Sequence, residues 1–365
     1  MSDKEIGRTS KRKGDHLAVS LQEDVSSLVA PGWEDVYLLH KCLPEVDKQE
    51  INLSTDLLGR RLRYPIVISA LTGGHEAALQ INANLATAAE EFGIAMGVGS
   101  ERAFLESAAW AASYAIARER APTAFLIANV GAPQLISQRS GEAYTMDQIR
   151  SAISLIQADA LAIHLNFLQE AVQPEGDVRA RGCGAAIARV ARDVAVPVIV
   201  KETGAGIVHE EATMLRSLGV AAIDVGGAGG TSMTMVESLR APSGSRQASL
   251  GRLLAGWGTP TAVSIAEAGI ARLPVIATGG IRNGLDAAKA LALGATAVGI
   301  ALPLLRVAAK DYPSTRAWLQ GFIEELHTAM FLTGSTSVVE LSRRVLVLGR
   351  VREWLVARGI LRNGP

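Results

Sequence analysis

The sequence predicts an α/β protein built as a (β/α)8 TIM barrel, and three observations support this fold class. Eight short apolar runs recur along the chain, each bounded by small or polar residues. A stretch long enough for a helix separates each run from the next, which is the alternation of a parallel sheet covered by helices. The runs are continuously apolar, as expected for strands that are buried on both faces. They span residues 65–72, 93–100, 124–129, 160–166, 197–202, 221–226, 274–279 and 297–301.

The rest of the chain divides into segments around this barrel. We expect residues 1–64 to be an N-terminal extension that includes a hairpin capping the bottom of the barrel. The barrel itself is expected to span 65–333, and its last helix is expected over 311–333 from apolar residues at i, i+3 and i+4. Residues 334–365 are expected to form a helical tail. The longest interruption, 231–258, is loop-like and is expected to act as a lid or binding loop.

Composition and charge exclude several classes of protein. The chain has 365 residues, of which 48% are hydrophobic, enough for a large core. Its 36 basic and 36 acidic residues give a net charge of +0, which provides no electrostatic reason to expect nucleic acid or an anionic membrane. No apolar run is long enough to span a membrane and the N-terminus lacks an apolar signal core, so we expect a cytoplasmic protein. Cys42 and Cys183 form no CxxC motif, so neither a zinc site nor a disulfide is expected.

Glycines at the ends of the last two strands predict a phosphate site. Active sites of these barrels lie at the C-terminal ends of the strands, and the loops after strands seven and eight commonly hold a phosphate. Here strand seven ends in Gly279 and Gly280, and strand eight contains Gly299. Glycines allow backbone N–H groups to approach phosphate oxygens, and the helix that follows adds a favourable dipole. Tight-turn glycines without a ligand remain the alternative.

Polar residues at the ends of strands four and five predict a catalytic cluster. His164 and Asn166 share one face of strand four because side chains alternate along a strand, and Gln169 and Glu170 follow in the loop. A carboxylate beside a carboxamide suits a hard cation and an oriented proton transfer. Lys201 ends an apolar strand and must reach a polar site in the barrel mouth or pair with an acid. The alternatives are a histidine satisfied in the core and a structural ion pair of Lys201 with Glu202 or Asp224.

Taken together, these motifs resemble those of the type 2 isopentenyl-diphosphate isomerases, from about residue 11 to about residue 342. The barrel and its glycines are shared with other FMN barrels and are moderately specific. The segments Arg12-Lys-Gly-Asp-His16 and His164-Leu-Asn-Phe-Leu-Gln-Glu170 are much more specific. The other matching segments are 71–74, 96–102, 174–177, 200–202, 224–231, 257–261 and 278–282.

The resemblance implies a role for each matching residue. The diphosphate of the substrate would contact Arg12, Lys13, Ser100, Arg102 and His164, with Asn166 nearby and Gln169 against the isoprenyl part. Glu170 would bind Mg²⁺ that bridges to the diphosphate. The residues implied for FMN are Ala70, Leu71, Thr72, Gly73, Ser100, Asn129, Lys201, Thr231, Gly279, Gly280, Ile281, Arg282, Ala301 and Leu302.

The implied reaction interconverts isopentenyl and dimethylallyl diphosphate by a 1,3-allylic proton shift without net redox change. Reduced FMN would stabilise the developing cation and exchange a proton, NADPH would serve as reductant, and Lys201 would keep the reduced ring anionic. Gln169, His164 and Lys201 are therefore the expected catalytic residues. Family members are homo-oligomers, so a tetramer or octamer is expected.

Some features depart from the family pattern or leave alternatives open. Glu101 stands where members often have Gln and adds a negative charge near the expected diphosphate site, while Trp257 is either part of a lid or a core residue. A 2-hydroxy-acid oxidase would need a His base near the end of strand seven, which this chain lacks. A nucleotide dehydrogenase would need a Cys after strand six, where Thr231 stands. A non-catalytic FMN-binding or assembly protein would bind neither Mg²⁺ nor a diphosphate.

Overall fold

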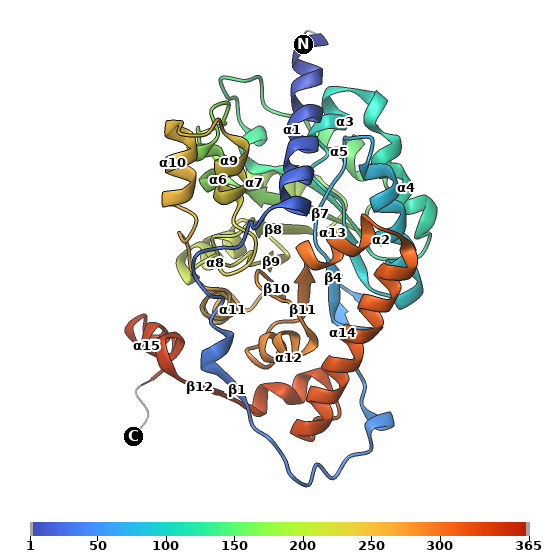
Figure 1. The fold of residues 1–365 in the computed structure, drawn as a ribbon, viewed down its shortest axis with the longest axis vertical. Helices are drawn as coiled ribbons and strands as arrows, with labels where there is room; N and C mark the ends of the chain where they lie inside the picture. The colour runs from blue at the N-terminus through green and yellow to red at the C-terminus, as the bar shows by residue number, and fades with distance from the viewer. Residues whose placement is uncertain (1–2, 363–365) are drawn as a thin grey trace.

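The computed structural model describes residues 3–362 and contains a closed barrel of eight parallel strands, so the predicted fold class is confirmed (Figure 1). Residues 1–2 and 363–365, the ends of the two predicted flanking segments, lie outside the described residues. Each predicted apolar run matches one strand of the barrel, and only β6 extends beyond its run, to Gly131. The strands, in order around the barrel, are β4 (Ile66–Ile68), β5 (Ala95–Gly97), β6 (Leu126–Gly131), β7 (Ala160–Leu165), β8 (Val198–Glu202), β9 (Ala222–Asp224), β10 (Val275–Thr278) and β11 (Ala297–Ile300).

Helices cover the outside of the barrel because each has an apolar face. In α7, for example, Cys183, Ile187 and Val190 are buried, and the last two join the main hydrophobic core. The helices between the first barrel strand and residue 333, α7 included, are α2 (Ala78–Phe92), α3 (Arg102–Glu106), α4 (Ala112–Arg120), α5 (Met146–Leu155), α6 (Phe167–Val172), α7 (Cys183–Asp193), α8 (His209–Ser217), α9 (Met233–Arg240), α10 (Arg246–Leu253), α11 (Thr261–Gly269), α12 (Gly284–Ala292), α13 (Leu302–Ala308) and α14 (Tyr312–Thr333).

A short hairpin fills the bottom of the barrel. Strands β2 (Thr55–Leu57) and β3 (Arg60–Leu62) pair antiparallel just before β4. Leu57 and Leu62 pack in one buried cluster with residues that face into the barrel, among them Val67 and Ile127. Many other members of the cluster are alanines, which leave room for the two leucines at the barrel's N-terminal end.

The two ends of the chain lie at opposite ends of the molecule. Helix α1 (Asp3–Gln22), to which the sequence analysis assigned no helix, lies beyond the barrel end toward which the β11 arrow points (Figure 1). Farther along the chain, β1 (Val36–Leu38) pairs antiparallel with β12 (Val345–Val347), and helix α15 (Gly349–Ala357) follows. Helix α1 packs against α9, α3 and α13, and therefore covers the end at which active sites of this fold are found.

The segment predicted as a long loop, 231–258, is largely helical, so that prediction is wrong. It contains α9 and α10, and the polar stretch 241–249 includes the start of α10. Ser245 caps α10 by accepting a hydrogen bond from the backbone N–H of Ala248 at 3.1 Å. The Ser238 hydroxyl on α9 donates to the Ala248 carbonyl at 2.7 Å, which ties the two helices together. Serines that resemble loop residues in the sequence thus serve as a cap and a helix–helix contact.

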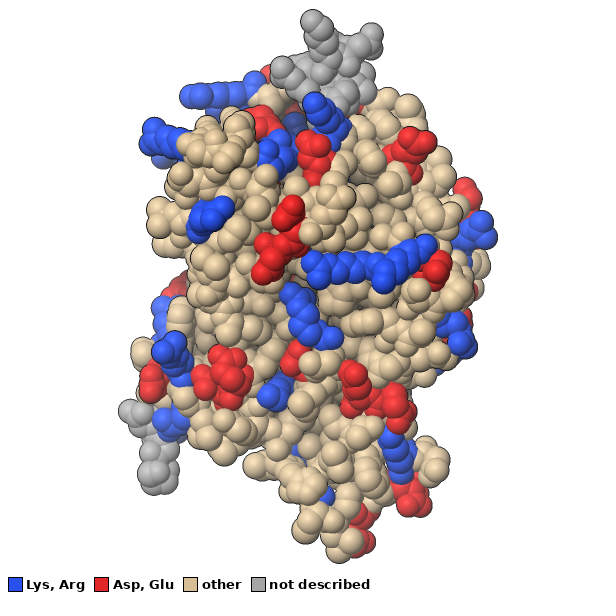
Figure 2. Space-filling model, in the orientation of Figure 1, with Lys and Arg blue, Asp and Glu red and all other residues tan. Residues whose placement is uncertain are grey.

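Charged side chains of both signs are spread over the face in view (Figure 2). Lys and Arg are interspersed with Asp and Glu there, as the net charge of +0 predicts (Figure 2). Among residues 3–362, no helix has both the length and the apolar character needed to cross a membrane.

Candidate active site

A cavity of about 290 Å³ opens at the C-terminal ends of the barrel strands. It lies between the loops after the strands and helix α1, which supplies Arg12, Lys13, His16, Leu17 and Ser20 to its wall. Every residue to which the sequence analysis gave a role at the site lines this one cavity. Residues separated by almost 300 positions in the chain, from Arg12 to Leu302, are therefore brought together.

The glycines after β10 form a cradle that has no room for side chains. Gly279 and Gly280 have φ values of +113° and +72°, a region that favours glycine. A Cβ on Gly279 would lie 2.2 Å from the carbonyl oxygen of Gly227. Asn283 then caps α12, its side-chain oxygen accepting from the backbone N–H of Asp286 at 2.8 Å. Backbone N–H groups, a helix N-terminus and the adjacent Arg282 suit a phosphate group.

Lys201 reaches the cavity from β8, in register with His164 on β7 and Asp224 on β9. Its Nζ donates to the backbone carbonyl of Glu202 at 2.8 Å rather than to a carboxylate. The Glu202 carboxylate instead accepts backbone N–H groups of its own loop, from Thr203 and Gly204 at 2.6 Å each. Burial raises the pKa of Glu202 to about 7, against the opposing effect of these hydrogen bonds. The geometry leaves the charge of Lys201 next to the cavity.

His164 is neutral in the protein. Its Nδ1 lies 2.9 Å from Oδ1 of Asn129, whose Nδ2 donates to the Val98 carbonyl at 3.2 Å. Because that amide oxygen can only accept, Nδ1 carries the proton and Nε2 has the free lone pair. Burial, together with the nearby Lys201, lowers the pKa of His164 to about 3.

Glu101 faces away from the cavity, which resolves the concern about its negative charge. The side chain is 0% exposed and does not line the cavity. One carboxyl oxygen accepts from the backbone N–H of Asn129 at 2.9 Å, and the other has no partner among the described residues. Burial raises the pKa of Glu101 to about 8. A carboxyl group that keeps its proton is neutral and resembles the amide of Gln.

Lys13 anchors helix α1 to the barrel. Its Nζ donates to the carbonyls of Gly73, at 2.8 Å, and Ser100, and to the hydroxyl of Tyr114 at 2.9 Å. Burial lowers the pKa of Lys13 to about 7, with the charge of Arg12 as the next cause. The three N–H bonds of this ammonium are thus engaged with protein atoms, and Arg12 is the freer of the two cations.

Arg102 is held between two acids at the edge of the cavity. Its Nε contacts Glu106 at 2.8 Å and one terminal nitrogen contacts Asp177 at 3.0 Å. Asp177 also accepts from the side-chain amide of Gln134 at 3.0 Å and from Ser140. The guanidinium is therefore fixed in place by a buried network before any ligand binds.

Glu170 and its neighbours offer oxygen atoms that suit a hard cation. The carboxylate is 3% exposed and accepts from Asn166 Nδ2 and from the backbone N–H of Asp177, both at 2.8 Å. The side-chain amide of Gln173 donates to it as well. The amide oxygens of Asn166 and Gln173 are buried and have no hydrogen-bond partner among the described residues. Carboxylate and amide oxygens are ligands that Mg²⁺ accepts, so these residues fit the expected metal.

The sequence analysis missed Glu237, which holds two residues that line the cavity. One carboxylate oxygen of Glu237 accepts from Gln169 Nε2 at 2.8 Å and contacts His16 Nε2 at 2.9 Å. The other accepts from Arg240 at 2.8 Å. No motif or spacing marks this acid, because it lies on α9, far in sequence from both residues that it holds.

Trp257 does not line this cavity and is not a core residue. It is 65% exposed and lines a separate cavity of about 640 Å³, together with Phe167, Ile207 and Val208. The core role considered for it from the sequence is therefore wrong. The turn that carries it ends at Gly258, with φ +137°, and directs the indole ring outward.

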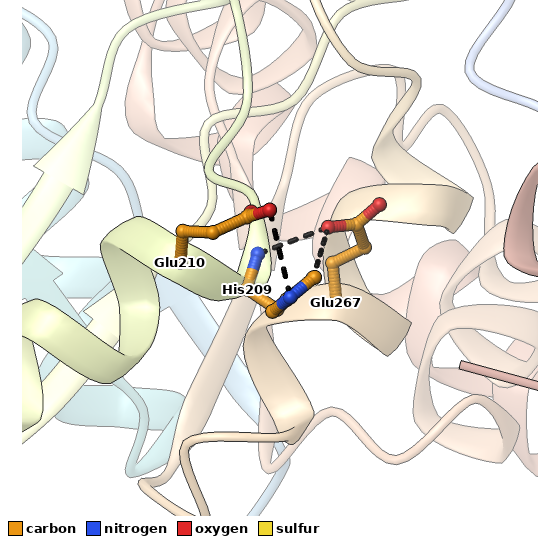
Figure 3. Close-up of side chains that lie close together, drawn as sticks. All are labelled: His209, Glu210 and Glu267. Carbon is orange, nitrogen blue, oxygen red and sulfur yellow. Dashed lines mark hydrogen bonds and ion pairs between the residues drawn. The ribbon is translucent and has the colours of Figure 1, made fainter. Parts of the chain in front are cut away.

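A cluster of His209, Glu210 and Glu267 lies outside the barrel mouth (Figure 3). Glu267 is 0% exposed and its carboxylate accepts from Trp354 at 3.0 Å, from Arg358 at 3.1 Å and from the backbone N–H of His209 at 2.9 Å. The guanidinium of Arg358 also contacts Glu210 at 2.5 Å. A cation of the protein thus already compensates these acids, and the cluster fastens α15 to α8 and α11.

Three features define the class of FMN-dependent barrel proteins: the closed barrel, the glycine cradle and the lysine near the end of β8. Residues 138–348 match the FMN-dependent dehydrogenase family. A lactate oxidase of Pediococcus acidilactici shares the fold, with a TM-score of 0.66 and 16% identity over 94% of each chain. A flavocytochrome b2 variant with pyruvate bound has a TM-score of 0.64 and 18% identity, covering 96% of this chain and 88% of its own.

Sequence relatives identify the family more narrowly. An isopentenyl-diphosphate delta-isomerase of Archaeoglobus fulgidus is 48% identical over 353 residues, covering 96% of this chain and 99% of the relative. The enzyme of the same name from Methanoregula boonei is 49% identical, covering 95% of this chain and 96% of the relative. The protein belongs to the isopentenyl-diphosphate delta-isomerase family, and the resemblance inferred from the sequence is confirmed.

Proposed function

We propose that the protein interconverts isopentenyl diphosphate and dimethylallyl diphosphate, with FMN reduced by NADPH and with Mg²⁺. One observation carries the proposal: the residues that the family resemblance implies for flavin, diphosphate and metal all line a single cavity. The relatives' names supply the substrate, and the FMN-dependent dehydrogenase family supplies the flavin. We further propose that the enzyme is cytoplasmic and assembles as a homo-oligomer.

The flavin would be held by the barrel mouth. The glycine cradle with Arg282 would bind its phosphate, and the backbone from Ala70 to Gly73 would support the ring. Bound and reduced, FMN would supply an electron-rich face and a centre for proton exchange. Lys201 would place a positive charge beside this ring and favour its anionic reduced form.

The diphosphate would bind where cations of the protein converge. Arg12 from α1 and Arg102 from the start of α3 both line the cavity, as does neutral His164. Glu170 would hold Mg²⁺ next to the diphosphate, because a hard cation and arginines together balance its charge. The imidazole Nε2 of His164, which carries no proton, can accept a hydrogen bond from bound water or from a protonated diphosphate oxygen.

The hydrocarbon part of the substrate would lie beneath α1. Leu17 and Met233 line the cavity near Gln169, and they would exclude water from a developing cation. Glu237 fixes the amide nitrogen of Gln169, so that its oxygen faces the substrate side. Gln169 would thereby orient the alkene for proton transfer.

The decisive experiment measures isomerisation of isopentenyl diphosphate under anaerobic conditions with FMN, Mg²⁺ and NADPH, omitting each component in turn. Formation of dimethylallyl diphosphate only in the complete mixture supports the proposal. A flavin-loaded protein that gives no product under any of these conditions overturns it and leaves a redox or binding protein. The absence of a histidine near the end of β10 already disfavours a 2-hydroxy-acid oxidase.

A further inference from the structure

The surroundings of Glu170 are built more elaborately than a single carboxylate ligand requires. Three donors converge on this carboxylate: the side-chain amides of Asn166 and Gln173 and the backbone N–H of Asp177. All three side chains, Glu170, Asn166 and Gln173, line the cavity while being at most 7% exposed. The carboxylate is thus oriented from three sides before any ligand arrives.

The carboxylate also fixes which way the two amides point. A carboxylate oxygen only accepts hydrogen bonds, so the NH₂ group of each amide must face Glu170. The carbonyl oxygens, Asn166 Oδ1 and Gln173 Oε1, are therefore the free ends. Both are buried without a hydrogen-bond partner among the described residues. A buried acceptor left unsatisfied destabilises the folded state, which indicates that a donor or cation belongs at these atoms.

The loop after α6 holds Gln173 in this position. Its backbone N–H donates to the Gln169 carbonyl at 3.1 Å, and the Gly176 N–H donates to the Gln173 carbonyl at 3.2 Å. A Cβ on Gly176 would lie 1.7 Å from the Glu170 carbonyl oxygen, so only glycine allows the loop to wrap this closely around the acid. The position of Gln173 follows from local backbone geometry and not from chance packing.

We propose that the amide oxygens of Gln173 and Asn166 belong, with Glu170, to the coordination shell of the metal. Gln173 then has two functions: its NH₂ group positions the Glu170 carboxylate, and its oxygen faces the cation or one of the cation's water ligands. This inference rests on the proposed function, which assigns the metal to Glu170 alone. Neutral carbonyl oxygens beside one carboxylate match the preference of Mg²⁺ and Mn²⁺ for hard ligands.

The test is a titration of the FMN-loaded protein with Mn²⁺, monitored by the EPR signal of the free ion, with inorganic diphosphate as the anion. The variant Gln173→Met keeps the length of the side chain and removes both the NH₂ group and the carbonyl oxygen of its amide. We expect its dissociation constant for Mn²⁺ to rise by about 10- to 100-fold, as for other groups that support metal ligands. Unchanged Mn²⁺ affinity in this variant would overturn the inference. Should it fail to fold, Gln173→Asn, which withdraws the amide by one methylene, is expected to weaken binding in the same direction.

A matched control separates loss of metal from loss of structure. Gln138 is also a buried glutamine, but its amide donates to the carbonyls of Pro133 and Arg179, both at 2.8 Å, and does not line the cavity. Gln138→Met is expected to keep the Mn²⁺ affinity of the unaltered protein. If Glu170→Gln loses Mn²⁺ while Gln173→Met retains it, only this inference fails. If even the unaltered protein binds no Mn²⁺ with diphosphate, the metal in the proposed function fails as well.

Discussion

Gln169 and Glu237 form a buried hydrogen bond of 2.8 Å that joins α6 to α9 across the cavity wall. The same carboxylate oxygen contacts His16 of α1 at 2.9 Å. Burial by itself would raise the pKa of Glu237, but His16, Gln169 and Arg240 together lower it to about 2. One ionised acid thus sets the position of two residues that line the cavity.

Replacing Glu237 by Gln should slow catalysis without removing the flavin. The neutral amide loses the charge that fixes Gln169 and His16, and we expect kcat to fall about tenfold or more, which corresponds to about 1.4 kcal/mol. Steady-state kinetics at equal FMN content would measure this. The control is Glu175→Gln, because Glu175 also pairs with Arg240, at 2.7 Å, but is exposed. Equal rates for the two variants would contradict the role of Glu237.

Replacing Lys201 by Ala should weaken FMN retention and isomerase activity together. The substitution removes the positive charge at the end of β8, and we expect the dissociation constant for FMN to rise about tenfold or more. Lys289→Ala is the matched control, since that lysine donates to the Trp33 carbonyl at 2.7 Å and does not line the cavity. Flavin fluorescence titrations would give both constants. If Lys201→Ala leaves affinity and activity unchanged, its assigned role is wrong.

Replacing Gly279 by Ala should empty the flavin site. The new Cβ would lie 2.2 Å from the Gly227 carbonyl oxygen, in a backbone conformation with φ +113°. We expect most of the FMN to be lost on gel filtration, measured as the ratio of flavin to protein absorbance. Gly269→Ala, where no atom lies within 4 Å of the added Cβ, should retain it. Full flavin content in Gly279→Ala would argue against a phosphate in this cradle.

Replacing Glu101 by Gln should stabilise the protein increasingly as the pH rises. Burial raises the pKa of Glu101 to about 8, whereas the unfolded chain releases this proton near 4.5. Between these values the folded state holds a proton that the unfolded state has lost, so the carboxyl group lowers stability progressively up to about pH 8. Lys13, the charged group that faces Glu101, is present in both proteins.

Thermal unfolding checks this prediction at two pH values. We expect the Tm of Glu101→Gln to be close to that of the unaltered protein near about pH 4.5 and several degrees higher near about pH 8.5. Glu119→Gln, at an exposed position, serves as the control. A difference in Tm that does not change with pH would show that Glu101 is not a buried, protonated acid.

Replacing Arg358 by Leu should lower stability and leave activity intact. Arg358 is the cation that joins Glu210 and Glu267, and its loss leaves the buried Glu267 with fewer partners (Figure 3). We expect a Tm lower by a few degrees and unchanged kcat. The exposed pair of Arg150 and Asp147, at 3.1 Å, offers the control variant Arg150→Leu, with little effect on Tm. A loss of activity in Arg358→Leu would connect α15 to the active site.

The barrel was predictable from the sequence because its signal is local. In the run 197–202, for example, the residues up to Val200 are continuously apolar, as in a strand covered on both faces. Helix α10 was not predictable, since its start within 241–249 is polar and depends on Ser245 as a cap and on Ser238 of the neighbouring helix. Helix α1 escaped prediction for the same reason: its polar sequence gains stability from packing on α9 and α13.

The residues of the candidate active site show the same difference between local and long-range signals. The glycine cradle and the segment from His164 to Glu170 lie within short stretches, so their residue types and spacing were readable. Glu237 and Tyr114 have no such context and become meaningful only when the fold places them beside Gln169 and Lys13. The direction in which Glu101 and Trp257 point depends on local backbone geometry, which residue type alone does not determine.

The position of α1 has a consequence for the order in which the protein is made. The ribosome synthesises residues 3–22 first. The helix α1 that they form packs against α9 and α13, which are synthesised after most of the barrel. A polar helix has little stability by itself, so its formation depends on packing against α9 and α13. The segment that is synthesised first is therefore the last to pack, and the cavity that Arg12 lines forms only after most of the barrel is complete.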